Sequence, residues 1–467
     1  MRSRTVVAVT SGLLLLALAC AAGAQGPGGL GPGAPGRPPM DETNRGELLQ
    51  DLERARAAHV ADPGDADARH GCAQLTYESG DFEGALLLLE PLLAEKDPAI
   101  DVLMLAARIE YLRGSHDRAE ELLQRILARE PDNAPALMKL VFVYYQTNQY
   151  DRCRTLPVEA LGDRRIPHLD LMLAFEDAPY QVVWRDGERT VVPFLVTDPL
   201  PVIKVEVNGR EVTALIDTGG DSFILDPTIA SELGIEIVAS MMGMFAGGME
   251  AEVGFARAKS LSLGGVTLNS VPMTVLPTNR MAIGGYTLDA IVGTGVLKQF
   301  LATLDYPNDR LVLRASTGAP DFYAEFAGTV VDEVPFYLQS THFLLAKGSL
   351  NGVDDLIFHV DSGLAGTPAF SAPRQTLDLV GIPVPEVEVR EGTMGGGGGG
   401  FAMGTFDIDQ LGLGGLTQGD LIGSYGGLPP HSYRMHGFIQ DGLISHNFLR
   451  HYALTLDFER MRMVFTQ

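Results

Sequence analysis

Cysteine is scarce in this sequence, and no two cysteines lie close together. Of the three in 467 residues, Cys20 lies in an apolar N-terminal segment, whereas Cys72 and Cys153 lie far apart. Because there is no C-x-x-C pair, we expect Cys72 and Cys153 to be small buried apolar side chains rather than a disulfide or metal ligands. The ten histidines form no H-E-x-x-H motif, so the sequence predicts neither a metal nor a cofactor.

Basic residues and long apolar runs are scarce as well. The chain has 35 Lys and Arg against 59 Asp and Glu, which gives a net charge of −24. Such an acidic chain repels polyanions, so we expect no nucleic-acid partner. Beyond the N-terminus, no stretch reaches the roughly 18 consecutive apolar residues that a membrane-spanning helix needs.

The N-terminal segment has the layout of a secretory signal. Arg2 and Arg4 precede an apolar run, and an A-x-A cleavage site follows at residues 22–24. We therefore predict a signal peptide over residues 1–24 and a protein that is exported, either periplasmic or secreted. Alternatively, the sequence ALAC ending at Cys20 resembles a bacterial lipobox, which would leave Cys20 acylated and the protein anchored to a membrane.

Residues 46–175, which follow a predicted Pro/Gly-rich linker over residues 25–45, contain an internal repeat. Three sets of landmarks recur every 34 residues: Tyr77, Tyr111 and Tyr145; Gly80, Gly114 and Asn148; and Ala85, Ala119 and Cys153. Apolar residues at helical spacing lie between these landmarks, and the Gly or Asn separates the two helices of each unit. The pattern resembles the tetratricopeptide repeat, with about three units after a partial helix at residues 48–60. Stacked units of this kind form either a scaffold without a ligand or a concave surface that binds a peptide or protein partner.

Residues 176–467 are predicted to be all-β, because short β-rich runs alternate with turns that contain Gly, Pro and Asp. Two lobes of this region, about residues 190–315 and 330–467, resemble each other. Each lobe has, in the same order, an Asn-Gly turn between strands, an Asp-Thr/Ser-Gly turn, a Leu-x-Leu-Gly-Gly run and a longer apolar segment. The paired positions are 208–209 and 351–352, 217–219 and 361–363, 261–265 and 411–415, and 289–306 and 441–458. We interpret the region as a tandem duplication.

The two Asp-Thr/Ser-Gly turns place an acid at the end of each apolar strand, where an unpaired buried charge is costly. A two-fold arrangement of the lobes would bring Asp217 and Asp361 face to face. Carboxyl groups that close share one proton, so one can accept a proton from a bound water while the other donates a hydrogen bond to a peptide carbonyl. We therefore predict that Asp217 and Asp361, hereafter the dyad, are catalytic.

The residues after each acid are expected to support the dyad. The hydroxyl groups of Thr218 and Ser362 can brace the two loops across the axis. Gly219 and Gly363 can let the backbone turn tightly and approach the acids closely.

These motifs resemble the aspartic peptidase superfamily, in particular its retropepsin-like branch in bacteria, over residues 195–467. The resemblance implies a peptide or protein substrate, a catalytic role for the dyad, and β barrels closed over a cleft by glycine-rich flaps. It also implies that Ile291-Val292-Gly293 supports the first catalytic loop from behind. The chain is thus expected to be multidomain, with an all-α helical-repeat domain followed by an all-β duplicated aspartic-peptidase domain.

Two glycine-rich segments, residues 244–254 and 392–404, lie where the flaps of this family would be. The resemblance therefore assigns substrate contacts to Gly247, Gly248, Gly397 and Gly398. A run of six glycines is too flexible for a rigid strand, so the second segment is either a mobile lid or a disordered surface loop.

Three features depart from the family pattern. Gly220 and Leu364 follow the two turns, where the family often has Ala or Ser. Ser445 replaces the glycine of the second supporting element, Leu443-Ile444-Ser445. Neither flap segment has the tyrosine of the pepsin-like branch. None of these changes removes a catalytic carboxyl group. They leave open a degenerate domain that binds peptides without cutting them.

Two weaker candidates remain near the turns. His359 lies two residues before Asp361, so it can tune the dyad or simply pack beside it. Ser445 and His446 together with Asp441 suggest a hydrolase triad, but the serine lacks a G-x-S-x-G elbow.

The leading hypothesis is an exported aspartic endopeptidase whose helical repeats recruit a substrate or partner. The alternatives are a non-catalytic periplasmic scaffold and a peptidase homodimer. The homodimer is disfavoured because one chain already supplies both acids.

Overall fold

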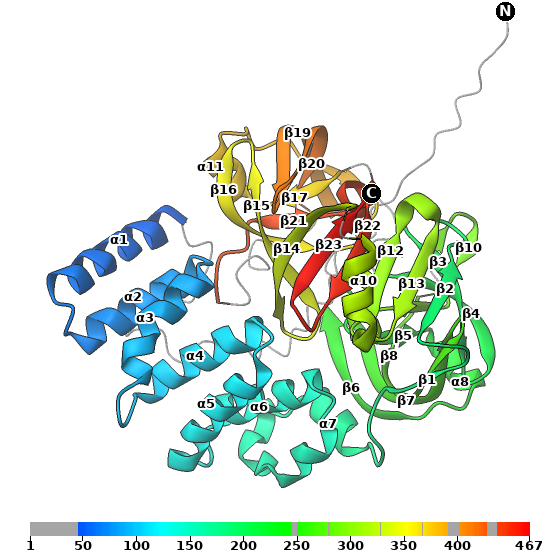
Figure 1. Ribbon diagram of the computed structural model, residues 1–467, viewed down its shortest axis with the longest axis horizontal. Helices are drawn as coiled ribbons and strands as arrows, with labels where there is room; N and C mark the ends of the chain where they lie inside the picture. Colours follow the sequence, from blue (N-terminus) through cyan, green and yellow to red (C-terminus); the bar gives the residue numbers. More distant parts are fainter. Residues whose placement is uncertain are drawn as a thin grey trace, which may run out of the picture.

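The computed structural model describes residues 45–467, apart from 245–249, 279–280, 327, 367, 391–400 and 427–436. Within these residues, helices fill the chain up to Leu173, and strands fill most of it from Gln181 onward (Figure 1). The predicted signal peptide, Cys20, nearly all of the predicted linker and the four flap glycines lie outside the described residues.

The helical part consists of paired helices that form an arc along one side of the β-rich part (Figure 1). The elements are α1 (Arg45–Ala61), α2 (Ala66–Glu78), α3 (Phe82–Leu93), α4 (Ile100–Leu112), α5 (His116–Arg129), α6 (Ala134–Gln146), η1 (Tyr150–Thr155), η2 (Val158–Arg164) and α7 (Pro167–Leu173). Gly80, Gly114 and Asn148 follow α2, α4 and α6 with φ of 90°, 75° and 58°. These left-handed conformations explain why the repeat has Gly or Asn at this position. None of the described helices is long and apolar enough to cross a membrane.

The third repeat unit differs from the expected helix pair. Its second helix is replaced by the short 3-10 helices η1 and η2. Pro131 follows Gly114 by 17 residues, whereas Pro157 follows Asn148 by only 9. Proline disfavours a helical conformation in the residue before it, and Leu156 is extended, so η1 ends before Pro157 and the third unit ends early.

Both cysteines of the helical part are buried and free, as predicted. The Sγ atom of Cys153 lies 4.0 Å from the Sδ atom of Met172, so it packs as an apolar side chain.

The first half of the β-rich part forms an eight-stranded sheet in the order β1-β8-β5-β11-β4-β3-β7-β6. Its strands are β1 (Gln181–Trp184), β3 (Val202–Val207), β4 (Arg210–Ile216), β5 (Phe223–Leu225), β6 (Ile237–Met244), β7 (Glu250–Leu263), β8 (Val266–Val275) and β11 (Ala290–Val292). The short strands β9 (Ala282–Ile283) and β10 (Tyr286–Thr287) pair separately. The helices of this stretch of the chain are α8 (Pro227–Glu232), α9 (Thr294–Leu297), η3 (Tyr306–Asn308), η4 (Ser316–Gly318) and α10 (Ala319–Phe326).

The remaining strands form a 13-stranded sheet in the order β18-β19-β20-β17-β21-β16-β15-β14-β23-β22-β12-β13-β2. They are β2 (Arg189–Pro193), β12 (Leu301–Asp305), β13 (Arg310–Arg314), β14 (Val330–Gln339), β15 (Phe343–Leu350), β16 (Val353–Val360), β17 (Phe370–Ala372), β18 (Glu388–Arg390), β19 (Phe401–Leu413), β20 (Leu416–Gly426), β21 (Gly442–Ile444), β22 (Ala453–Asp457) and β23 (Arg462–Thr466). Helices α11 (Arg374–Val380) and α12 (His446–Leu449) complete the described elements.

The same strand pairings recur in the two halves. In the first half β4 runs parallel to β11, β11 antiparallel to β5, and β5 parallel to β8. In the second half the same relations join β16 to β21, β21 to β17, and β17 to β20. The hairpins before each acid turn at Asn208-Gly209 and Asn351-Gly352, with φ between 47° and 83° at all four residues. This conformation is the reason for the Asn-Gly pairs.

A strand from each half joins the two halves into one sheet. β12 pairs antiparallel with β22, and Thr303 lies opposite Thr455. Their buried hydroxyl oxygens are 2.8 Å apart.

The helical part shares a buried apolar core with the first sheet and with residues of the second half from Tyr337 to Phe438. The repeated tyrosines all reach across this boundary. The ring of Tyr77 packs edge-on against Phe438 at 5.7 Å, and the hydroxyl of Tyr111 donates to the carbonyl of Ser340. The hydroxyl of Tyr145 lies 3.4 Å from the carboxylate of Asp221. One edge of the repeat array is therefore covered by the β-rich part of the same chain.

Candidate active site

The two acids follow equivalent strands. Asp217 follows β4 and donates its backbone N–H to the carbonyl of Val292 at 3.1 Å; Asp361 follows β16 and donates to Ile444 at 2.9 Å. Both side chains are essentially inaccessible to solvent. The parallel neighbour strand thus fixes the position of each acid at the end of its own strand.

The structure brings the two carboxyl groups together across the glycines of the opposite turns. A Cβ atom added at Gly219 would lie 2.8 Å from Oδ2 of Asp361, and one added at Gly363 would lie 2.1 Å from Cγ of Asp217. Neither glycine has a positive φ. Both glycines lie in turns, so the expected tight turn and close approach are present without a left-handed conformation at either glycine.

Backbone N–H groups orient the carboxyl groups. Gly219 donates to Oδ1 of Asp217 at 2.7 Å, and Gly363 donates to Oδ1 of Asp361 at 2.8 Å. The other oxygen of Asp217, Oδ2, is buried without a protein donor among the described residues. A proton held between the two acids would satisfy this oxygen.

The hydroxyl groups of Thr218 and Ser362 join the two loops by reciprocal hydrogen bonds. Thr218 donates its backbone N–H to Oγ of Ser362, and Ser362 donates its N–H to Oγ1 of Thr218, both at 3.0 Å. The hydroxyl of Thr218 also lies 3.3 Å from the carbonyl of Val360, the residue before Asp361. These bonds tie the backbone of one loop to the other and so fix the separation of the acids.

Burial raises the pKa of both acids. For Asp217, burial and then the nearby charge of Asp361 raise the pKa well above 3.8, although the Gly219 N–H opposes this. For Asp361, burial raises the pKa to about 6, opposed by hydrogen bonds from the N–H of Gly363, from Asp217, and from the N–H groups of Leu364 and Gly219. Above about pH 6 the dyad therefore holds one proton shared between its two carboxyl groups.

Comparisons with known proteins agree with this geometry. Residues 203–297, which include the first turn, match the family model described as aspartyl protease, and residues 111–156 match that of the tetratricopeptide repeat. Each match covers well under half of the chain, so it marks one region as similar to aspartyl proteases and another as similar to tetratricopeptide repeats.

The curated relatives match only one region of the chain. DNA damage-inducible protein 1 of Neurospora crassa is 30% identical over 116 residues, and that of Chaetomium globosum is 26% identical over 113 residues. Each match covers 24% of this chain and 24% of the relative, so the chain spans about a quarter of the length of these relatives.

Two solved structures are similar at low scores. A retropepsin-like aspartic protease from Rickettsia conorii is 16% identical, with 29% of this chain and 94% of that chain covered and a TM-score of 0.20. Conglutin gamma, a basic 7S globulin from lupine seeds, is 10% identical, with 60% and 95% covered and a TM-score of 0.36. Scores this low carry no argument about the function of the chain.

The element Ile291-Val292-Gly293 lies directly behind the loop that carries Asp217. A Cβ atom at Gly293 would lie 2.4 Å from the carbonyl oxygen of Ser222 and 2.5 Å from that of Gly220. Only glycine fits this contact. Thr294, the next residue, donates its hydroxyl to the carbonyl of Thr218 at 2.8 Å and so holds the loop.

The corresponding serine of the second half has different contacts. The hydroxyl of Ser445 donates to the carbonyl of Pro368 at 2.8 Å and accepts the N–H of Asn447 at 3.1 Å, which caps α12. The departure from glycine is thus accommodated.

The hydrolase triad is not assembled. While Ser445 bonds to Pro368, Asp441 accepts the N–H of Ile357 at 2.9 Å and pairs with Arg45. The ring of His446 packs edge-on against Tyr306 at 5.0 Å.

His359 is buried beside the second half's core strands. Its ring meets that of Phe343 edge-on at 4.8 Å.

Sequence reasoning missed a buried charged cluster on the loop that carries Asp217. Asp221 lies four residues after Asp217 and is 5% exposed, and its carboxylate is 3.0 Å from Nε2 of His168 on α7. An acid directly after Asp-Thr-Gly-Gly was the available signal. Its partner could not be read from the sequence, because His168 comes from the helical part, 53 residues away.

Proposed function

We propose that this protein is an aspartic endopeptidase that hydrolyses peptide bonds with a water molecule activated between Asp217 and Asp361. The observation that carries the proposal is the dyad itself: two buried carboxyl groups lie side by side, and their raised pKa values leave one proton between them. The match of residues 203–297 to aspartyl proteases supports the same reaction class.

The unequal pKa values assign a role to each acid. Asp361 has the lower pKa and takes a proton from the water, whose oxygen bonds to the peptide carbonyl carbon. Asp217 gives its proton to the carbonyl oxygen, which gains charge as the tetrahedral intermediate forms. As the C–N bond breaks, the leaving nitrogen takes the proton from Asp361, and Asp217 recovers its proton from the intermediate's hydroxyl group.

The proposal includes a tandem duplication of the peptidase lobes. The recurring parallel and antiparallel pairings of β4, β5, β8 and β11 with their counterparts support it, as do the two Asn-Gly hairpins. One chain then supplies both acids, so a homodimer is not needed for catalysis.

The proposal also includes export, from the basic, apolar and small-residue order of residues 1–24. The substrate would be a peptide or protein outside the cytoplasm, and the faces of the tetratricopeptide repeats that the β-rich part leaves uncovered would be available to a protein partner.

The decisive experiment compares cleavage of a denatured protein mixture by the wild type, Asp217→Asn and Asp361→Asn from pH 3 to pH 8. We expect cleavage by the wild type alone. Asp226→Asn is the matched control, because Asp226 is an equally buried acid of the same half that accepts the N–H of Thr228 at the start of α8. A wild type that is inert at every pH, or an active dyad variant, would contradict the proposal, and undiminished peptide binding without products would favour the scaffold alternative.

A further inference from the structure

Asp221 takes no part in the proposed reaction, yet it is buried on the same loop as Asp217. Its carboxylate faces the helical part, where Nε2 of His168 lies at 3.0 Å and the hydroxyl of Tyr145 at 3.4 Å. Burial raises the pKa of Asp221, but the hydrogen bond and charge of His168, the charge of His342 and a hydrogen bond from Thr341 outweigh it and hold the pKa at about 2. Asp221 is therefore an anion throughout the pH range in which the dyad can work.

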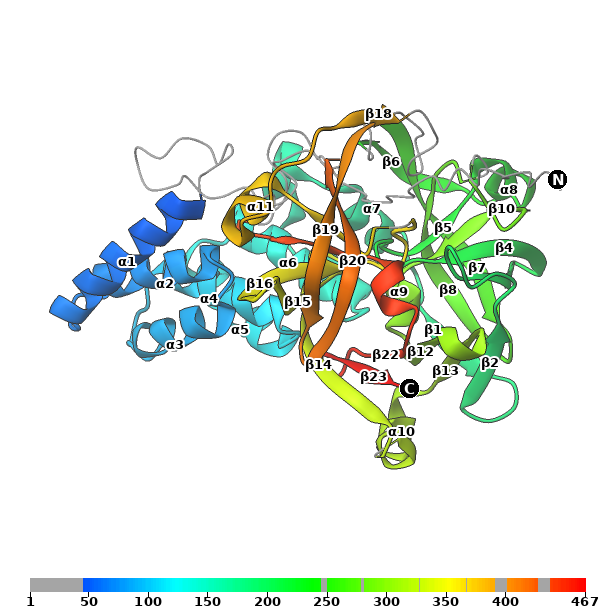
Figure 2. The ribbon, with the colours of Figure 1, turned by 90° about the horizontal axis from the view of Figure 1, so that it is seen from above.

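His168 also contacts the hairpin of β6 and β7. Its ring packs against Phe255 of β7 at 4.8 Å, and α7, which carries His168, packs against both strands (Figures 1 and 2). The residues of this hairpin that the structure describes lead directly into the predicted first flap segment. One short helix thus contacts the first catalytic loop and the hairpin of the same half.

The end of α6 contacts the second half in the same place. Gln146 donates its side-chain amide to the carbonyls of Thr341 at 2.8 Å and Ser340 at 3.2 Å. Nδ1 of His342 lies 4.0 Å from the carboxylate of Asp221. The helical part therefore contacts one loop from each half beside the dyad.

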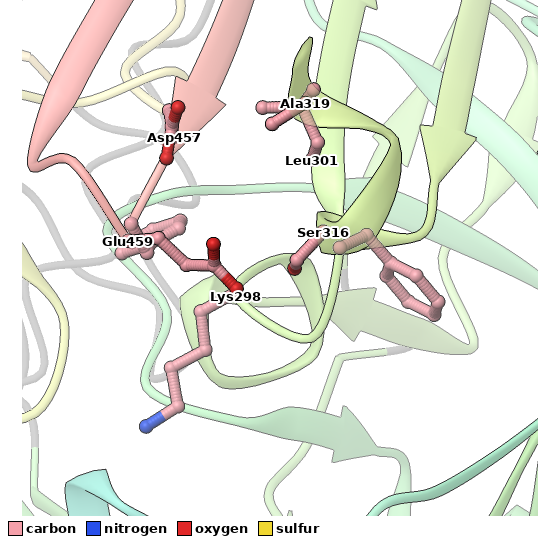
Figure 3. A pocket seen from close by; sticks show the side chains of 8 residues that line it. Lys298, Leu301, Ser316, Ala319, Asp457 and Glu459 are labelled. Atoms are coloured by element: carbon pink, nitrogen blue, oxygen red, sulfur yellow. The ribbon is translucent and has the colours of Figure 1, made fainter. Parts of the chain in front are cut away.

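Lys298 adds a further link from the first half. It contributes to a small pocket with Asp457 and Glu459, but its amino group points away from the other lining side chains (Figure 3). That group donates to the carbonyl of Gln146 at 2.9 Å and to its side-chain oxygen at 2.6 Å. Three side chains face the carboxylate of Asp221: His168 and Tyr145 from the helical part and His342 from the second half. The amino group of Lys298 and the phenol groups of Tyr150 and Tyr180 lie near enough to interact with its charge.

We propose that Asp221 and His168 are positioning residues through which the helical part, by way of α7, holds the first catalytic loop in its active geometry. This inference rests on the proposed function. It makes the helical part a component of the active-site framework rather than a separable recruitment module. The Asp221 carboxylate anchors the loop on α7, and Asp217 precedes it by four residues on that loop.

The test compares His168→Ala with His168→Gln in the full chain. The side-chain amide of glutamine can replace Nε2 as a donor to Asp221, whereas alanine cannot. Because small displacements of a reacting group cost on the order of 10–100-fold in rate, we expect His168→Ala to lower kcat by that factor with KM within about twofold. His168→Gln should recover most of the loss.

Glu120→Gln is the matched control, because it breaks an ion pair with Arg152 that lies wholly within the helical part. It should leave kcat and KM unchanged. If Glu120→Gln lowers kcat as much as His168→Ala does, a general destabilisation of the helical part explains the loss, and the inference is overturned.

Backbone hydrogen exchange of residues 217–222 gives a second readout that needs no activity. Exchange should be faster in His168→Ala and Asp221→Ala than in the wild type, and close to wild type in His168→Gln. Equal exchange and equal kcat in the glutamine and alanine variants would show that the histidine only fills space, and the inference would fail. A wild type without peptidase activity would overturn the proposed function, while the exchange measurement would still decide whether His168 holds the loop.

Discussion

Ionising the dyad should destabilise the folded protein, and Asp361→Asn should remove that cost. The pKa of Asp361 is about 6 in the folded protein against an ordinary value of 3.8. A raised carboxyl pKa contributes stability that is fully present below about pH 3.8 and is lost as the pH rises through about 6. One unit of pKa difference corresponds to about 1.4 kcal/mol, so the free energy of unfolding should fall by about 3 kcal/mol from this group alone.

The assay is urea unfolding of the wild type and Asp361→Asn between pH 4 and pH 7. Asparagine mimics the protonated acid. The free energy of unfolding of the variant, relative to that of the wild type, should therefore increase by about 2–3 kcal/mol as the pH rises over this range. Asp221→Asn is the control of opposite sign. The Asp221 pKa is held at about 2, so its contribution is present above about pH 3.8 and is lost as the pH falls through about 2. Removing this charge should cost about 2 kcal/mol at pH 7.

Two results would refute this reasoning. If the difference in the free energy of unfolding between the wild type and Asp361→Asn is the same at pH 4 and pH 7, ionisation of Asp361 does not destabilise the folded protein as predicted. A variant that is less stable than the wild type at pH 7 would show that the ionised carboxyl is held by interactions stronger than its burial penalty.

Three further predictions concern catalysis and docking. With a fluorogenic peptide, kcat/KM should rise as the pH increases through about 6, where Asp361 ionises while Asp217 keeps its proton. A flat profile from pH 4 to 7 would contradict the assignment. Gly363→Ala should abolish cleavage, because the added Cβ atom would lie 2.1 Å from the carboxyl group of Asp217. Gly220→Ala should retain cleavage, because its added Cβ atom would meet no atom closer than 3.4 Å. Equal activities of the two variants would argue against the packed dyad. Gly80→Ala, with φ of 90° and a Cβ 2.7 Å from the β-rich part, should lower the melting temperature by several degrees. In Gly71→Ala, within α2, the added Cβ atom would meet no other atom within 4 Å, so this variant should be more stable than the wild type by about 1 kcal/mol. A Gly71→Ala variant that is less stable than the wild type would refute this reasoning.

Local features of the fold could be predicted from the sequence because they depend on local backbone chemistry. The Asn-Gly hairpins and the Gly80, Gly114 and Asn148 turns are single positions that need a left-handed conformation. The buried acids could be predicted because a charge at the end of an apolar strand demands a partner, and the sequence contains one other position of the same kind.

Contacts between distant elements could not be predicted in this way. No local pattern pairs His168 with Asp221, or Gln146 with the loop at residues 340–342, because each partner is ordinary in its own segment. The early end of the third repeat was visible in Pro157, but the 34-residue period concealed it, since the landmarks up to Cys153 still fit.

The dyad is built from two similar but unequal loops, and this difference gives the cleft a direction. Asp217 accepts the N–H of Gly219 and Asp361 accepts that of Gly363, but the N–H groups of Leu364 and Gly219 also lower the pKa of Asp361. An extended polypeptide is itself polar, with its carbonyl groups and amides in a fixed order from N- to C-terminus. A site with interchangeable acids would accept either orientation, but here turning the chain around would exchange the proton donor and the proton acceptor, so substrates should thread through it one way.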